Sequence, residues 1–214
     1  YSSLRVCCCV GKRRASHDLR IPTIYQIRPF CYIVHMCGIA GIIGLRDVQS
    51  AQGKIDSMLR QLAHRGPDAE GCLVNDGVAL GHRRLSIIDL SESANQPMTD
   101  PSGRYTIIYN GEIYNFRKVK SKLKDYPYST ESDTEVILAS YIKYGPACLS
   151  ELNGMFALAI WDANERTLFV ARDRLGVKPL YYSITGDGIL VFASEVRAIL
   201  DSGLVERKVD SRGL

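Results

Sequence analysis

The sequence predicts an α+β fold, a four-layer αββα sandwich in which two stacked, mainly antiparallel sheets lie between outer helices. Short apolar segments separated by turn residues outnumber the helical patterns, which favours a sheet-based architecture. Residues 155–161 (MFALAIW) are apolar at every position, so both faces of that strand must be covered. Helices outside two stacked sheets satisfy both observations.

The expected strands share short apolar runs that are bounded by Gly, Pro, Asn or Asp. They are predicted at 37–44, 72–74, 78–80, 105–109, 155–161, 167–171, 178–184 and 189–193. Asp76-Gly77 is typical of a hairpin turn between the second and third of these strands. Arg84–Asp89 leads into a polar, proline-bearing loop at 91–103, and the strand after it runs into Asn110-Gly111-Glu112.

The helices are predicted from apolar repeats of three and four residues and from capping signals. The first covers Ile55 to Ala63 and ends at His64-Arg65-Gly66-Pro67, because glycine and proline terminate helices. Asn115 is expected to cap a short basic helix. Ser132 to Glu135 has the capping-box pattern and opens a helix that ends at Gly145-Pro146. A closing helix starts at Ser194-Glu195.

Composition is that of an ordinary globular protein, with 46% hydrophobic and 23% charged residues in a chain of 214. No run of 18 apolar residues occurs, so no membrane-spanning helix is expected. Residues 1–35 hold six Lys and Arg and one acidic residue, so residues 36–214 carry a balance of −1 out of the total of +4. A nucleic-acid partner is therefore not expected.

Residues 1–35 differ from the rest of the chain. They begin at Tyr1, contain four of the seven cysteines, and lack both a hydrophobic period and the order of regions found in signal peptides. We expect a leader that is disordered or not part of the mature protein, with a propeptide as the alternative. The other cysteines, Cys37, Cys72 and Cys148, form no metal-like spacing and no even disulfide set. No metal site is expected, and a cytoplasmic location is favoured.

Cys37 follows Met36 directly and is followed by Gly38, Gly41 and Gly44. If Met36 starts the chain and is removed, the thiol and a free α-amine belong to the same residue. That amine has a reference pKa of about 7.7–8.0 and can act as the base for its own side chain. The structural alternative is a buried cysteine on a core strand.

Four other positions can be interpreted together with this cysteine: Arg84, Asn110, Gly111 and Asp133. Taken singly, each has a structural explanation, as an exposed strand charge, a hairpin turn or a helix cap. Taken together they suit free glutamine. A guanidinium fits its α-carboxylate, an aspartate fits its α-ammonium, and an Asn side chain with a backbone N–H fits the oxyanion formed when a thiol attacks the amide.

The chain resembles the glutaminase half of glutamine-hydrolysing asparagine synthetases, which are class II (N-terminal-nucleophile) glutamine amidotransferases. The motifs that carry this resemblance occur in the family's order from Met36 to about Leu200. They are MCGIAGI, HRGPD, GHRRLSIIDLS, QPM, NGEIYN, SDTEVIL, GMFALAIWD, RDRLGVKPLYY and FASEVRAIL. The αββα sandwich is then expected to be the N-terminal-nucleophile hydrolase fold.

The resemblance implies that Cys37 is the nucleophile and that Asn110 and Gly111 form the oxyanion hole. Arg84 would hold the carboxylate of glutamine, and Glu112 and Asp133 would lie at its ammonium end. The pocket lining would include Leu85, Ser86, Ile87 and Ile88, as well as Asn110 and Gly111.

The resemblance also implies a domain at 36–205 and, at 206–214, the start of a linker to a C-terminal synthetase domain. In that domain, with ATP and magnesium, ammonia would convert aspartate to asparagine; no cofactor is expected in this chain itself. One alternative is a related amidotransferase with another acceptor, such as a polysaccharide precursor. Another is an inactive glutamine-binding module, if residues 1–35 stay attached and block the amine. A homodimer is left open.

Overall fold

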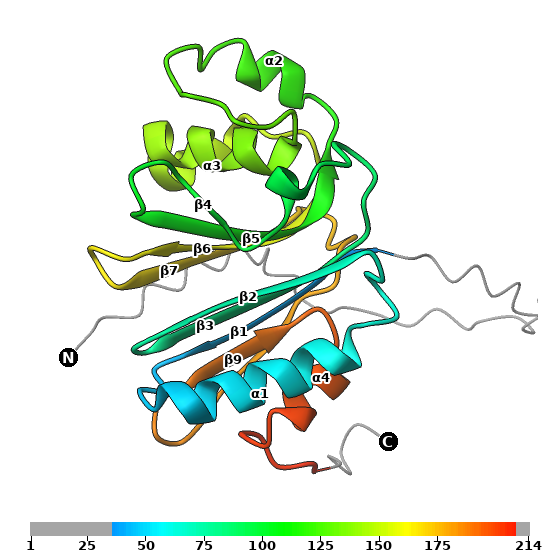
Figure 1. Cartoon of the computed structure of the whole chain (residues 1–214), viewed down its shortest axis with the longest axis vertical. Helices are drawn as coiled ribbons and strands as arrows, with labels where there is room; N and C mark the ends of the chain where they lie inside the picture. Colours follow the sequence, from blue (N-terminus) through cyan, green and yellow to red (C-terminus); the bar gives the residue numbers. More distant parts are fainter. Residues whose placement is uncertain (1–35, 209–214) are drawn as a thin grey trace, which may run out of the picture.

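The computed structural model describes residues 36–208, as two antiparallel sheets enclosed by helices (Figure 1). The expected leader at 1–35 and most of the expected linker, 209–214, lie outside the described residues. The strands are β1 (Gly38–Ile43), β2 (Ala69–Asn75), β3 (Val78–Arg84), β4 (Met98–Thr99), β5 (Tyr105–Ile113), β6 (Gly154–Asp162), β7 (Thr167–Arg172), β8 (Tyr181–Ile184) and β9 (Leu190–Ala193). The helices are α1 (Val48–Gln61), α2 (Phe116–Lys120), α3 (Asp133–Tyr144) and α4 (Val196–Asp201), with short 3₁₀ turns at Glu92–Ala94 and Gly145–Ser150.

The layers follow the predicted αββα order. One sheet has the strand order β2-β3-β1-β9-β8 and the other has the order β4-β5-β6-β7. Helices α2 and α3 cover the four-stranded sheet, and α1 and α4 cover the five-stranded sheet (Figure 1). Strand β1 is therefore the central strand of its sheet, between β3 and β9.

Three apolar clusters fill the spaces between these four layers. The cluster between the sheets contains Ile39, Ile108 and Phe192, and the two outer clusters lie under α1 with α4 and under α3. Strand β6 shows why its sequence is apolar throughout. Ala157, Ala159 and Trp161 face the other sheet, whereas Phe156, Leu158 and Ile160 face the helices. The prediction that both faces are covered is confirmed.

The prediction that the strand ends at Asn110-Gly111 is wrong. Strand β5 continues to Ile113, with Asn110 opposite Ala157 and Gly111 opposite Phe156. Strand β6 begins at Gly154, so it supplies a partner for every residue of β5. A Cβ atom at Gly111 would lie 2.4 Å from the carbonyl oxygen of Met155, so the glycine permits close strand approach rather than a turn.

Two other local predictions need correction. Asn115 precedes α2 but makes no capping bond; its side chain donates to Glu151 O (2.8 Å) and accepts from Asn153 N (2.9 Å). Strand β4 lies inside the region expected to be a loop. Its two residues, Met98 and Thr99, pair with Ile107 and Thr106 of β5.

The predicted capping box at α3 is half formed. Ser132 accepts from Glu135 N at 3.3 Å, as expected of an N-cap. The Glu135 carboxylate, however, accepts from the backbone and hydroxyls of Ser129 and Thr130. It therefore holds the preceding loop onto the helix.

No helix in the described part of the chain is long and apolar enough to cross a membrane.

Candidate active site

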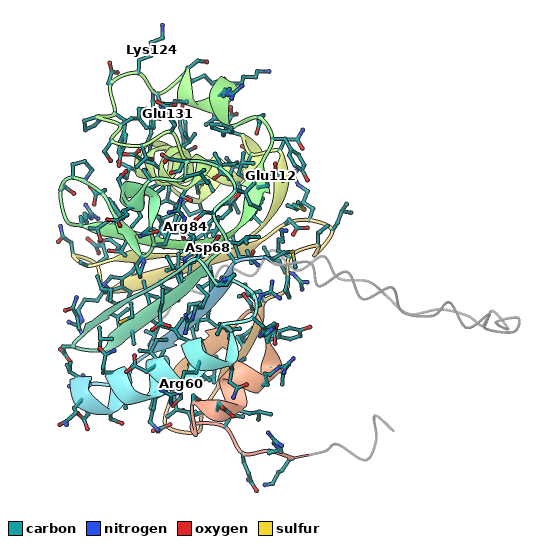
Figure 2. The ribbon with its side chains drawn as sticks, turned by 45° about the vertical axis from the view of Figure 1, so that its right-hand side comes forward. Arg60, Asp68, Arg84, Glu112, Lys124 and Glu131 are labelled. Atoms are coloured by element: carbon teal, nitrogen blue, oxygen red, sulfur yellow. The ribbon has the colours of Figure 1, made fainter. Side chains whose placement is uncertain are left out.

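A cavity of about 220 Å³ lies where the two sheets meet and receives side chains from both. Nearly all of the predicted site residues line it: Cys37, Arg84, Leu85, Ile87, Ile88, Asn110, Gly111, Glu112 and Asp133. Ser86 does not line this cavity, and its backbone N–H donates to Asp68 Oδ2 at 2.8 Å. Figure 2 shows Arg84 and Asp68 near the junction of the layers, with Glu112 on the layer of β5.

Cys37 immediately precedes β1, so the centre of the five-stranded sheet fixes its position. Its Sγ accepts from Leu85 N at 3.3 Å and donates to Leu85 O at 3.6 Å. Its carbonyl oxygen accepts from Arg65 Nε at 3.0 Å. Burial raises the pKa of the thiol above its usual value, although the bond from Leu85 and the charges of Arg84 and Lys178 oppose the shift. The thiol therefore needs a base before it can act as a nucleophile.

Arg84 ends β3 and is buried. Its Nη1 donates to Ser91 O (2.8 Å) and Asn95 Oδ1 (2.7 Å), and its Nη2 donates to Asp89 O. A guanidinium has five donors, so these contacts leave two for a ligand in the cavity. Arg84 thus fastens the loop at 85–95 as well as lining the cavity. Its sequence position gave no sign of this second role.

Asn110 is almost completely buried in β5, at 1% exposure. Its Nδ2 is among the few buried side-chain atoms of the described residues that lack a hydrogen-bond partner. A buried unpaired donor costs about 1–3 kcal/mol, so native proteins tend to keep one only where it serves a purpose. Asn110 lines the same cavity as Cys37.

Asp133 is the first residue of α3 and is also buried. Its Oδ2 accepts from Tyr109 Oη at 2.8 Å and from Ile113 N at 3.0 Å. Burial raises the pKa of this carboxyl group, and the bonds from Ile113 and Tyr109 lower it less than burial raises it. Burial, followed by the charge of Asp133, raises the pKa of Tyr109 well above its ordinary value. Asp133 is therefore anchored to β5, whereas Glu112 lines the cavity and is partly exposed.

Sequence reasoning missed one cation at this site, Lys178, which is 7% exposed. Its Nζ lies 3.0 Å from Sδ of Met36, the residue before the cysteine, and both residues line the cavity. Burial lowers the pKa of Lys178, as does the charge of Arg65, whereas Cys37 and Glu112 raise it. The strand predicted at 178–184 begins only at Tyr181, as β8, so Lys178 lies in the loop between β7 and β8 rather than on a strand.

Gln96, Tyr109 and Thr134 also line the cavity and were not predicted. Within residues 36–208, no group of three or more His, Cys, Asp and Glu side chains could hold a metal ion.

Comparison with known proteins places these features in context. Residues 36–214 match the family described as the glutamine amidotransferase domain. Over 185 residues the chain is 43% identical to asparagine synthetase (glutamine-hydrolyzing) 3 of Bacillus subtilis, covering 84% of this chain and 30% of that protein. It is 38% identical to asparagine synthetase B (glutamine-hydrolyzing) of Escherichia coli K12 over 167 residues, covering 77% and 30%. It is 40% identical to amidase chry2 of Gibberella zeae over 182 residues, covering 79% and 27%.

A solved structure supports the same fold. The glutamine phosphoribosylpyrophosphate amidotransferase of B. subtilis, complexed with ADP and GMP, superposes with a TM-score of 0.67 and 25% identity. The match covers 78% of this chain and 44% of that one. The chain spans less than a third of the length of the asparagine synthetases named above. The family match covers most of the chain, and the chain therefore belongs to the glutamine amidotransferase domain family.

Proposed function

We propose that this domain hydrolyses glutamine to glutamate and ammonia, with Cys37 as the nucleophile. The observation that carries the proposal is the unpaired Nδ2 of Asn110, a residue that lines the same cavity as Cys37 and Arg84. A donor left unpaired beside a nucleophile suits a negative charge that exists only during the reaction.

The first half of the reaction forms a thioester. The α-amine of Cys37, when that residue begins the chain, takes the thiol proton, and sulfur attacks the amide carbon of glutamine. Asn110 Nδ2 and the N–H of Gly111 donate to the oxyanion of the tetrahedral intermediate. The intermediate collapses as the ammonium of Cys37 returns the proton to the departing nitrogen, which leaves as ammonia. Water then hydrolyses the thioester, the amine again acting as base, and releases glutamate and the free thiol.

The ends of the substrate are assigned by charge. The two donors that Arg84 keeps free face the α-carboxylate, and the carboxylates of Glu112 and Asp133 face the α-ammonium. The raised thiol pKa supports a role for the amine, because burial leaves the sulfur protonated without a base.

The names of the relatives support a role in asparagine synthesis. We propose that the ammonia passes to a C-terminal synthetase domain, where ATP and magnesium would activate aspartate. The relative named as an amidase favours the alternative, that the same glutaminase serves another acceptor. A cytoplasmic location and a homodimer remain predictions.

The test compares ammonia release from glutamine by a chain that begins at Cys37 with that of its Cys37→Ala variant. Release by the variant should equal background, while Cys72→Ala, at an exposed cysteine, should match the parent. A chain that keeps residues 1–35 should also be inactive, because its Cys37 nitrogen is an amide with no basic lone pair. N-terminal sequencing confirms where each chain begins. If Cys37→Ala kept a tenth of the parent rate, the mechanism would be wrong.

A further inference from the structure

Within residues 36–208, the edge of β5 beside the proposed oxyanion donor has no strand neighbour. Strand β4 pairs with β5 only through Met98 and Thr99, opposite Ile107 and Thr106. Beyond that point, among the described residues, β5 pairs with β6 alone. The N–H and C=O of Tyr109, the residue before Asn110, therefore have no strand partner on this edge. Such backbone groups in a buried setting must find other partners.

Two side chains supply those partners. Gln96 Oε1 accepts from Tyr109 N at 2.6 Å, and His82 Nε2 donates to Tyr109 O at 3.1 Å. Both side chains are buried, His82 at 1% and Gln96 at 7% exposure. Gln96 belongs to the QPM motif, whose function the sequence did not explain, and His82 is on β3 of the opposite sheet.

Each side chain is itself held in place. Gln96 Nε2 donates to Thr134 Oγ1 at 3.2 Å, which ties it to α3. The backbone of Gln96 packs against β2, because a Cβ at Gly71 would lie 2.3 Å from Gln96 O. His82 lies on β3, two residues before Arg84. Burial lowers the pKa of His82 to about 3, with the charge of Arg84 acting the same way and the bond to Tyr109 opposing both. The imidazole is therefore neutral, and Nε2 carries its proton.

The two contacts fix the peptide planes on either side of Tyr109. The plane that ends at Tyr109 N is held by Gln96, and the plane that joins Tyr109 O to the nitrogen of Asn110 is held by His82. The second plane sets the direction in which the Asn110 side chain leaves the backbone. An unpaired Nδ2 has no bond of its own to keep it in place, so its position depends on this backbone.

We propose that Gln96 and His82 are positioning residues that hold Asn110 and Gly111 in the geometry required to stabilise the oxyanion. This inference rests on the proposed glutaminase function and adds two residues to it. His82 does not line the cavity; Gln96 does, but its Oε1 bonds Tyr109 N and its Nε2 bonds Thr134 Oγ1. Their effect on the reaction acts through the backbone of Tyr109.

The experiment compares the parent with four variants, all in chains that begin at Cys37. For each protein it measures kcat, KM for glutamine and the melting temperature. Gln96→Leu and His82→Leu remove the contacts to Tyr109. His82→Gln keeps an N–H near the place of Nε2 and tests rescue. Thr106→Val is the matched control, since it removes another buried polar contact of β5, the 2.9 Å bond to Thr99, four residues before Asn110.

We expect Gln96→Leu and His82→Leu to lower kcat by about 10–100-fold, below the 10²–10³-fold expected for complete loss of one oxyanion donor. KM for glutamine should stay within twofold, because the substrate's charged ends are bound elsewhere. His82→Gln should recover most of kcat. Thr106→Val should lower the melting temperature without changing kcat.

A second measurement uses the γ-aldehyde analogue of glutamine, whose carbonyl adds the Cys37 S–H to give a tetrahedral hemithioacetal. Affinity for the aldehyde should fall with kcat in the two leucine variants, whereas affinity for glutamate should not. If kcat of both leucine variants equals that of Thr106→Val, the positioning role is refuted while the glutaminase stands. If the parent itself releases no ammonia, the proposed function fails, and this inference with it.

Discussion

Gly111→Ala is the substitution that tests the proposed oxyanion hole most directly. The added Cβ would lie 2.4 Å from Met155 O, 2.7 Å from Tyr109 Cε2 and 2.8 Å from Phe156 Cα. Two of these three atoms are backbone atoms of β6, which cannot rotate away, so β5 and β6 must separate where Gly111 faces Phe156. Overpacking of this kind costs about 1–3 kcal/mol, and contact with backbone puts Gly111→Ala near 3 kcal/mol.

We expect the variant to stay folded at room temperature, so that the loss in stability can be measured as a fall in melting temperature. For a domain of 150–250 residues, 1 kcal/mol lowers the melting temperature by about 2–4 °C, so we expect a fall of about 6–12 °C. Glutamine hydrolysis should also fall by about 100-fold, because both proposed oxyanion donors move with the strand. Thermal unfolding followed by circular dichroism and ammonia release at 25 °C provide the two readouts.

Two other glycines separate stability from catalysis. Gly41→Ala creates a clash in the core, with its Cβ 2.3 Å from ring carbons of Phe192, so it should lower the melting temperature with a much smaller loss of kcat. Gly53 lies in α1 with nothing within 4 Å of an added Cβ, so Gly53→Ala should stabilise the protein by about 0.5–1 kcal/mol. A Gly111→Ala protein with unchanged melting temperature and full activity would refute this reading of the site.

Three further predictions concern charged residues. Arg84→Lys should raise KM for glutamine at least tenfold and change kcat less than threefold, because lysine loses the forked geometry for a carboxylate. If steady-state kinetics show an unchanged KM and a large loss of kcat, Arg84 has another role. Lys178→Met should move the pH profile of Cys37 alkylation by iodoacetamide to higher pH, because the lysine charge lowers the thiol pKa, whereas Lys178→Arg should leave it near that of the parent. For Asp173, burial alone would raise the pKa, but four donations from the N–H groups of Lys178, Val177, Phe156 and Leu175 lower it overall. Its contribution to stability is present above its unfolded pKa of about 3.9 and is lost as pH falls through the lower folded value. The difference in melting temperature between Asp173→Asn and the parent should therefore be large at pH 7 and should shrink as pH falls below about 3.9.

The parts of the fold that could be predicted from the sequence depend on local patterns. The apolar run of β6 and the Asp76-Gly77 turn could be predicted because periodicity and turn chemistry depend on residues close together in the sequence. Strand β4 was missed because two residues carry no period, and it exists only through pairing with Thr106 and Ile107. The Asn115 side chain instead bonds Glu151 and Asn153, which lie 36 and 38 residues away and which no capping rule considers.

The candidate site divides in the same way. Cys37, Arg84, Asn110, Gly111 and Asp133 could be chosen because their chemistry suits glutamine and their motifs resemble a family. The supporting contacts could not be chosen, because they join segments that only the folded chain brings together. Lys178 reaches Met36 across 142 residues, and Gln96 and His82 meet at Tyr109 from two different layers.

The central place of β1 has a consequence for how this protein is made. One neighbour of β1 is β3, which follows soon afterwards in the chain, but the other is β9, at Leu190–Ala193. A ribosome that adds about 5–20 residues per second leaves that second edge of β1 open for roughly 7–30 s. During this interval the strand that follows Cys37 is an exposed apolar edge, the kind of surface that pairs with other chains. Within the described part of the chain, Cys37 is thus among the first residues to be synthesised. The sheet that holds it is completed only when β9 has been made.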